Sequence, residues 1–277
     1  MKISIEDFFE DILGKSMRGL GFSTSQLSKK TGVSESLIRQ FLQGQFSDQD
    51  ENPLRTLASA LGLDPGALVV SAKKQWHPQN VELEGLQQFN TPWHDMLVNA
   101  FLVWDPQTQI AAAFDTGTDA SAILAAVDAR QLKLKSIFIT HTHGDHIADL
   151  DTLQQGCDPD TSIYCNRLEP QAGSALFDEG TSFAIGNLSV HTFTTSGHSI
   201  GGTTYFIEGL ARPIAIVGDA MFAGSMGGGQ ISFTDALQNN RQKILTLPDN
   251  TILCPGHGPI SSIAEEKQHN PFFPEFK

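Results

Sequence analysis

The stretch ITHTHGDHIADL, residues 139–150, restricts the fold of this 277-residue sequence more than any other feature. It continues an apolar run, LKSIFIT, whose β-branched and aromatic content is typical of a buried strand. Alternate residues of an extended chain point to the same side, so His141 and His143 can reach one ion. Asp145 and His146 then stand where a helix would begin and can reach a second position nearby. Four polar side chains in one turn are hard to satisfy with hydrogen bonds alone, so the motif predicts a metal site at a strand end.

Three further candidate ligands follow apolar runs and are next to glycines. They are His198 in SGHSIGGTTY, Asp219 in IVGDAMFAG and His257 in CPGHGP. Glycine lets the backbone pack close to an ion. Five imidazoles and two carboxylates can supply two nitrogen and oxygen sites that share one carboxylate. Such a donor set suits two divalent ions, with zinc expected and iron or manganese as alternatives, rather than a thiolate site.

The chain divides into two regions with different hydrophobic patterns. Short apolar runs from Trp93 onward alternate with helical stretches such as DASAILAAVDARQL, which predicts a layered α/β domain. The preceding region has apolar residues at helical spacing, interrupted by glycine turns. We therefore expect an all-α domain at 1–72, a linker at 73–90 and an α/β domain at 91–277.

With these motifs in this order, residues 93–273 resemble the metallo-β-lactamase-fold superfamily. The resemblance implies an αββα sandwich with the site at one edge of its two sheets. It also implies that three histidines bind the first ion, namely His141, His143 and His198. The second ion would be bound by Asp145, His146 and His257. Asp219 would bridge the two ions, and Asp115 in FDTG matches a strand-end position that we interpret as orienting a ligand.

Within this superfamily the motifs are most similar to glyoxalase II-type hydrolases and their relatives, including persulfide dioxygenases. That similarity implies hydrolysis of a thioester or related carboxylic ester by a metal-bound hydroxide, with Asp145 orienting the nucleophile. Two departures leave the substrate open. The 20 residues after His257 are too few for the C-terminal helical domain of glyoxalase II. The loop GSMGGGQIS also lacks the basic residue that family members usually carry there.

Residues 5–70 resemble the lambda-repressor/Cro-like helix-turn-helix family, which implies DNA binding. The recognition helix would be Ser34–Leu42 and begin at the capping residue Ser34, with Glu35, Ser36, Arg39 and Gln40 facing outward. Residues 1–74 nevertheless carry no net charge, and Arg39 is the only cation on that helix. Dimerisation or protein binding is the alternative role for this region, because DNA affinity rests largely on phosphate contacts.

Three other functions are alternatives to hydrolysis. An iron-dependent persulfide dioxygenase would use the same scaffold. A nuclease is disfavoured because the net charge of −13 falls entirely within residues 75–277. A regulator that senses a metabolite through the metal domain is an alternative of another class, although a sensor would not need a complete hydrolytic site.

Cysteine content and hydropathy indicate the surroundings of the protein. Three cysteines without a CxxC pair argue against a disulfide framework. No apolar stretch is long enough to span a membrane, and the acidic start MKISIEDFFEDIL is not a targeting signal. We therefore expect a cytoplasmic protein that acts on a small molecule, without a membrane partner, and forms a homodimer through its helix-turn-helix region.

Overall fold

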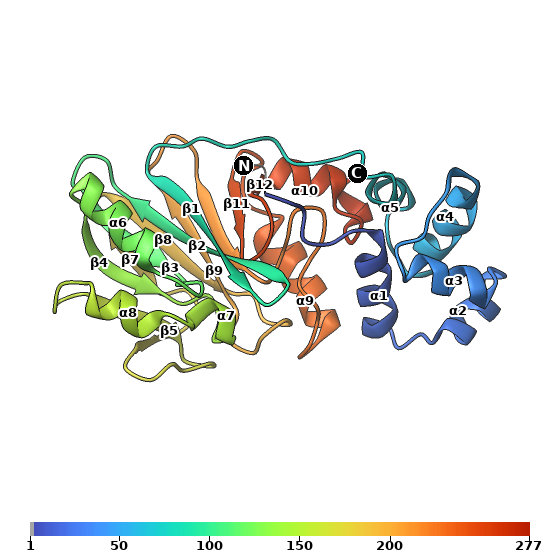
Figure 1. The fold of residues 1–277 in the computed structure, drawn as a ribbon, viewed down its shortest axis with the longest axis horizontal. Coiled ribbons are helices and arrows are strands. Elements are labelled where there is room, and N and C mark those ends of the chain that lie inside the picture. Colours follow the sequence, from blue (N-terminus) through green and yellow to red (C-terminus); the bar gives the residue numbers. More distant parts are fainter. Residues whose placement is uncertain (1–2) are drawn as a thin grey trace.

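The computed structural model describes residues 3–277. Helices form one end of the molecule, and two stacked sheets with their flanking helices form the rest (Figure 1). The helical end comprises α1 (Phe9–Gly19), α2 (Thr24–Thr31), α3 (Glu35–Phe41), α4 (Glu51–Ala60) and α5 (Pro65–Ala72), with a short 3-10 turn, η1 (Asp48–Asp50). Ser23, Ser34 and Asp64 cap α2, α3 and α5 by accepting hydrogen bonds from backbone N–H groups of the first turn.

The first sheet has six strands in the order of the chain. They are β1 (Leu86–Trp93), β2 (Met96–Trp104), β3 (Ile110–Phe114), β4 (Lys133–Phe138), β5 (Ser162–Asn166) and β6 (Ala175–Phe177). β1, β2 and β3 are antiparallel, whereas β3 to β6 run parallel. Three helices accompany this sheet: α6 (Ser121–Arg130), α7 (Gly144–Ile147) and α8 (Leu150–Gln155). The parallel strands place the start of α7 at the carboxyl end of β4.

The second sheet has the order β12-β11-β10-β9-β8-β7. Its strands are β7 (Ser182–Ile185), β8 (Leu188–Thr194), β9 (Thr203–Glu208), β10 (Ile214–Gly218), β11 (Ile252–Pro255) and β12 (Ser261–Ser262). β10 and β11 are parallel, and the other neighbours are antiparallel. Two helical elements lie between β10 and β11, α9 (Phe233–Asn239) and η2 (Asn240–Ile244), and two follow β12, α10 (Ile263–His269) and η3 (Pro274–Phe276).

Three apolar clusters hold these layers together. The cluster between the sheets contains Phe101, Phe114 and Phe138 from the first sheet and Tyr205 and Ile216 from the second. A second cluster packs α6 and α8 on the outer face of the first sheet. These layers give the mixed α/β sandwich that the sequence predicts.

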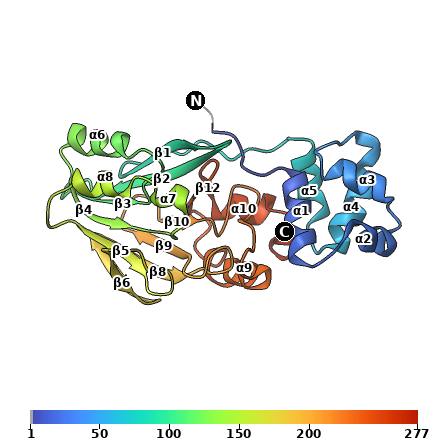
Figure 2. The same cartoon turned by 60° about the horizontal axis from the view of Figure 1, so that its bottom comes forward.

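The third cluster joins the helical end to the second sheet. It includes apolar residues of all five helices, α1 to α5, together with Val217 of β10, Phe233 of α9 and the buried tail residues Phe272 and Phe273. The Asp64 N–H donates to the carbonyl oxygen of Pro271 at 2.7 Å, just before that pair. Figure 2 shows the helical end beside α9, α10 and the C-terminus. The five helices therefore share one continuous core with the second sheet.

The predicted linker at 73–90 is too long at its C-terminal end. α5 ends at Ala72, but β1 already begins at Leu86 and pairs along β2 from Leu86 opposite Val103. Two glutamines and an asparagine made this segment look like a loop. Only Phe89 and Thr91 of β1 are buried, so the apolar signal of the strand is weak.

Candidate metal centre

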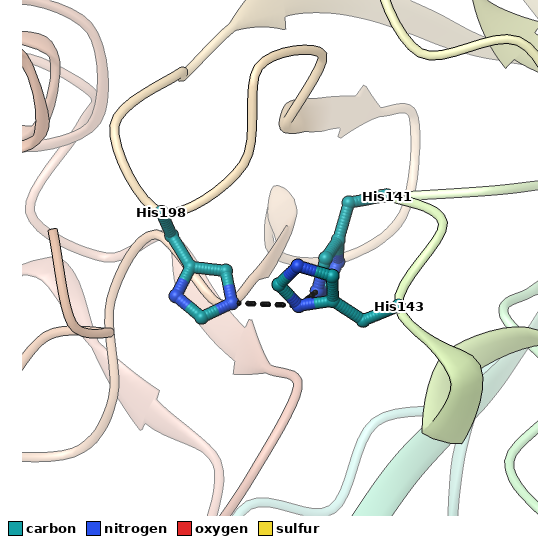
Figure 3. Close-up of side chains that lie close together, drawn as sticks. All are labelled: His141, His143 and His198. Atoms are coloured by element: carbon teal, nitrogen blue, oxygen red, sulfur yellow. Dashed lines mark hydrogen bonds between the residues drawn. The ribbon is translucent and has the colours of Figure 1, made fainter. Parts of the chain in front are cut away.

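Three histidines converge at the edge between the two sheets. His141 and His143 leave the end of β4, and His198 comes from the loop between β8 and β9 (Figure 3). His143 Nδ1 lies 3.1 Å from His141 Nε2 and 3.0 Å from His198 Nε2. Three ring nitrogens this close together are suited to share one cation, because a neutral imidazole offers a lone pair at one nitrogen.

A second group of donors lies beside the first. Asp145, His146 and His257 each offer one atom, and these atoms lie within 4.8 Å of one another. His257 Nε2 is 3.3 Å from Asp145 Oδ2. Asp145 and His146 lie in the short helix α7, and His257 lies in the loop that follows β11. The second group therefore forms where α7 meets that loop.

Asp219, after β10, lies between the two groups. Its Oδ1 is 3.3 Å from His146 Nε2, and its Oδ2 is 3.3 Å from His198 Nε2 and 3.4 Å from His257 Nε2. The carboxylate thus faces both groups at once, as a bridging ligand would. All seven residues that were predicted as ligands are brought together.

The outer nitrogens of the histidines are held by acceptors, which fixes the tautomers. His198 Nδ1 donates to the carbonyl oxygen of Gly228 at 3.0 Å, and His257 Nδ1 donates to that of Leu97 at 2.8 Å. A carbonyl can only accept, so each of these rings carries its proton on Nδ1. In the neutral rings Nε2 therefore carries a lone pair, which faces the centre and can bind a cation.

Asp115 contacts His146 and Thr140 next to the donor cluster. Its Oδ2 lies 2.8 Å from His146 Nδ1, and it accepts hydrogen bonds from the N–H and the hydroxyl of Thr140 at 2.7 Å each. Its backbone has φ +57°, a left-handed conformation that is uncommon outside glycine. This contact agrees in geometry with a ligand-orienting role, which remains a prediction.

Glycine is required where backbone approaches the donors. A Cβ at Gly256 would lie 2.1 Å from Asp219 Oδ1 and 2.6 Å from His146 Cε1. A Cβ at Gly218 would lie 2.6 Å from the hydroxyl oxygen of Thr140. The glycines flagged in the sequence therefore leave the space in which the ligands turn inward.

Unsatisfied polar atoms indicate that this cluster fits cations. Among residues 3–277, His146 Nε2 and Asp219 Oδ1 are buried and have no hydrogen-bond partner. Buried polar atoms without partners are rare in folded proteins and costly. Nitrogen and carboxylate donors at these positions suit zinc, iron or manganese, so the residues present fit two divalent ions.

The same cluster has strongly perturbed ionisation. Burial lowers the pKa of His146, but the charges of Asp219 and Asp115 outweigh it and raise that pKa to about 10. Burial also opposes protonation of His257, whose pKa nevertheless rises to about 11 beside Asp219 and Asp145. Despite burial, His257 and His146 hold the pKa of Asp219 well below its usual range. In the ion-free protein these histidines retain protons that a cation must displace.

Comparison with known proteins agrees with this geometry. The family model described as Metallo-beta-lactamase superfamily matches residues 95–257, which is more than half of the chain. The chain belongs to the metallo-beta-lactamase superfamily. The matched range contains every predicted ligand, from His141 to His257.

Two curated relatives and one solved structure show how far this similarity extends. The chain is 28% identical over 203 residues to Probable metallo-hydrolase YqgX of Bacillus subtilis, covering 64% of this chain and 92% of the relative. It is 29% identical over 204 residues to Hydroxyacylglutathione hydrolase GloC of Haemophilus influenzae, covering 63% and 92%. The crystal structure of BLEG-1 B3 metallo-beta-lactamase is 28% identical and covers 67% of this chain and 99% of its own, with a TM-score of 0.57. About a third of this superfamily member therefore has no counterpart in BLEG-1.

A cavity of about 890 Å³ opens above the donor cluster. His143, Asp145, His198, Asp219 and His257 lie in its lining. Its other walls come from the β1–β2 turn, from the loops after β10 and from the first helix. Residues of these walls that the sequence did not suggest are Glu6, Asp7, Asp11, Lys15, Arg18, Trp93, Met96 and Phe222. No pattern in the sequence links the first five of these, Glu6 to Arg18, to a site whose first ligand, His141, lies more than 120 residues further along the chain.

The predicted DNA-reading residues lie elsewhere, on α3 at the helical end (Figure 1). Ser34, Ser36, Arg39 and Gln40 are exposed, and Glu35 is partly exposed. Arg39 forms an ion pair with Glu35, so α3 carries no net charge. DNA binding therefore remains a prediction, as does dimerisation.

Within residues 3–277, none of the helices has both the length and the apolar content needed to cross a bilayer. The three cysteines, Cys157, Cys165 and Cys254, are free thiols.

Proposed function

We propose that this superfamily member is a metal-dependent hydrolase that uses two divalent ions to cleave a thioester or related carboxylic ester. The observation that carries the proposal is the meeting of seven nitrogen and oxygen donors at the base of a cavity. The similarity to GloC, which is named a hydroxyacylglutathione hydrolase, and to YqgX, named a probable metallo-hydrolase, supports the same chemistry.

Each of the two ions would have its own set of ligands in this chain. One histidine triad would hold the first ion, and Asp145, His146 and His257 would hold the second, with Asp219 facing both. When bound, such ions lower the pKa of a water molecule to roughly 7 and polarise a carbonyl oxygen. Asp145 lines the cavity and is placed to orient an attacking water and to accept its proton.

The cavity lining favours attack by water over attack by a side chain. Among the described residues, the lining contains no serine, threonine or cysteine. Cys165 and Cys254 are buried, and burial raises the pKa of both thiols, to about 11 for Cys165. A thiolate leaving group needs little protonation, which suits a site without a separate general acid.

The test begins with elemental analysis of the protein as isolated, followed by thioester hydrolysis with and without a chelator. We expect about two equivalents of divalent metal per chain and activity that the chelator removes. Asp219→Ala should lose both metal and hydrolysis, whereas Asp178→Ala, an exposed carboxylate on the β6–β7 turn, should keep both. Hydrolysis by a metal-free Asp219→Ala protein would overturn the proposal.

Iron-dependent persulfide oxidation is a second candidate because the donor set contains imidazoles and carboxylates without thiolate, which also suits iron. Oxygen uptake measured on the same sample separates the two. Iron at two equivalents, with oxygen consumption on a persulfide and no thioester cleavage, would replace the hydrolase with the dioxygenase.

A DNA-binding regulator is the candidate of another class, and the exposed face of α3 is its supporting feature. Fluorescence anisotropy with operator-like and random duplexes at two salt concentrations tests it. Binding that is absent at low salt would leave the helical end a packing or dimerisation module.

A further inference from the structure

The first helix forms part of the cavity above the donor cluster. Glu6, Asp7, Asp11, Lys15 and Arg18, in and just before α1, lie in the same lining as His143 and His257. They face the glycine-rich loop after β10, which contributes residues 228–230 to that lining. The helical end is therefore a wall of the pocket as well as a neighbour of the sandwich.

A buried ion pair fixes α1 in this position. Lys15 pairs with Asp7, and their side chains are 13% and 8% exposed. Lys15 Nζ also donates to the carbonyl oxygen of Met226 at 2.9 Å, and Asp7 accepts from the Ser225 hydroxyl at 2.6 Å. α1 is thus tied directly to the segment that follows Asp219.

A close approach fixes the other end of α1. A Cβ at Gly19 would lie 2.2 Å from Cγ of Phe233, and a Cβ at Gly229 would lie 2.4 Å from Cα of Phe233. The last turn of α1 and the glycine-rich loop therefore both contact the start of α9. Arg18 stands next to Gly19 in the chain and lies in the same cavity lining as residues 228–230 of this loop.

Arg18 is the positively charged side chain of the cavity lining that is available to bind a substrate. Lys15 and Arg18 are the lysine and arginine residues of the lining. Lys15 is already committed to Asp7 and to Met226. Arg18 is exposed, and within residues 3–277 it forms no ion pair with a carboxylate. The nearby Asp11 accepts a hydrogen bond from the Phe8 N–H at the start of α1.

The size of the cavity indicates a substrate that reaches Arg18. At about 890 Å³ it falls at the upper end of the range for small-molecule sites, and it exceeds the space that a short acyl group needs. A molecule whose carbonyl lies at the donor cluster would extend its remaining atoms toward α1. A guanidinium group binds carboxylate with two parallel hydrogen bonds.

We propose that Arg18 of α1 is a specificity residue that binds a carboxylate of the substrate, in the part of the molecule remote from the scissile bond. The inference rests on the proposed function, because it takes the substrate to be a thioester. It assigns to the helical end a direct part in substrate recognition.

The test measures binding separately from catalysis. Two probes are compared. The first is S-methylglutathione, which has two carboxylates and a thioether in place of the thioester, so a thioester hydrolase cannot cleave it. The second is its diamide, in which both carboxylates are converted to amides. Dissociation constants for both are measured by calorimetry on the full chain with the metal it carries as isolated. The variants are Arg18→Ala and Arg18→Lys. Arg130→Ala, which removes the same charge from an exposed position at the end of α6, is the matched control.

We expect the wild type to bind the dicarboxylate more tightly than the diamide, and Arg18→Ala to weaken dicarboxylate binding about tenfold. Binding of the diamide should stay within twofold, Arg18→Lys should restore part of the preference, and Arg130→Ala should match the wild type. With a carboxylate-bearing thioester as substrate, Arg18→Ala should raise KM and leave kcat unchanged.

Other results contradict the inference. If the wild type does not prefer the dicarboxylate, or binds neither probe, Arg18 is not a carboxylate-binding residue. An equal loss for both probes in Arg18→Ala would indicate a structural role and would also overturn it. Binding through Arg18 without thioester cleavage would refute the proposed hydrolase and leave the binding site standing, so the two failures are distinguishable.

Discussion

Replacement of Lys15 by methionine tests how firmly the helical end is joined to the metal domain. Methionine keeps most of the length and apolar character of the lysine stem and removes only the charge. The change deletes the ion pair with Asp7, the hydrogen bond to the Met226 carbonyl and a cation–π contact 5.0 Å above the Phe222 ring. Asp7 would then be a buried carboxylate whose remaining side-chain partner is the Ser225 hydroxyl.

The expected cost follows from the burial of this pair. Removal of one partner from a buried ion pair costs about 3–5 kcal/mol, because the other charge is left uncompensated. Since Asp7 keeps the bond from Ser225, we take the lower end, about 3 kcal/mol. For a chain of this size, each kcal/mol lowers Tm by about 2–4 °C, so Tm should fall by about 6–12 °C.

The assay is thermal unfolding of the chelated protein, because bound ions would stabilise the folded state by mass action. Lys15→Met is compared with Asp7→Asn and with the double variant. Removing both charges should recover part of the loss, giving a coupling free energy above about 1 kcal/mol. Arg167→Met breaks the exposed pair with Asp178 and should change Tm little.

Two results would refute this reasoning. If Lys15→Met unfolds within 1–2 °C of the wild type, the pair does not anchor α1. If the single changes add without coupling, the two side chains do not interact as a buried pair. In either case the wall of the cavity that α1 forms would be a loose contact.

Three further predictions concern other positions. Asp115→Asn should weaken metal retention against a chelator about 10–100-fold, because the amide cannot orient His146 as a carboxylate does. Burial raises the pKa of Glu266 from its ordinary 4.5 to about 7, so the folded state holds that proton more tightly than the unfolded state. The free energy of unfolding should therefore fall as pH rises from about 4.5 to about 7, by at most about 3 kcal/mol, and Glu266→Gln should remove that slope in urea titrations. Gly19→Val should lower Tm by forcing a side chain into Phe233, and Phe233→Ala should restore part of the loss; an unchanged Tm in Gly19→Val would show that α1 does not dock there.

The centre could be predicted from the sequence because each of its parts is local. Each predicted ligand follows a strand or begins a helix, and a glycine precedes each of His198, Asp219 and His257. His141 and His143 are two residues apart in extended chain, so their common direction follows from strand geometry. The position of Asp219 between the groups was implied by the resemblance to the metallo-β-lactamase-fold superfamily, and spacing alone did not predict it.

The cavity walls could not be predicted, because they depend on how distant surfaces fit. Arg18 and Lys15 lie on an amphipathic helix whose sequence reads as an ordinary exposed face. Their place over the centre depends on the contact between Gly19 and Phe233, which are more than 200 residues apart. β1 was missed in part for a related reason, since its polar residues gain strand structure only by pairing with β2.

The shared core has a consequence for how this protein can be dissected. The helices of residues 9–72 cover Phe233, Phe272 and Phe273 together with the apolar outer face of the second sheet. A fragment that begins after α5 would expose that apolar surface to water and to other chains, and we expect it to aggregate. BLEG-1 aligns over 99% of its length with about two thirds of this chain. The helical end of this protein therefore cannot be removed without exposing part of its apolar core. We expect its deletion to make the protein insoluble before any loss of a binding function could be measured.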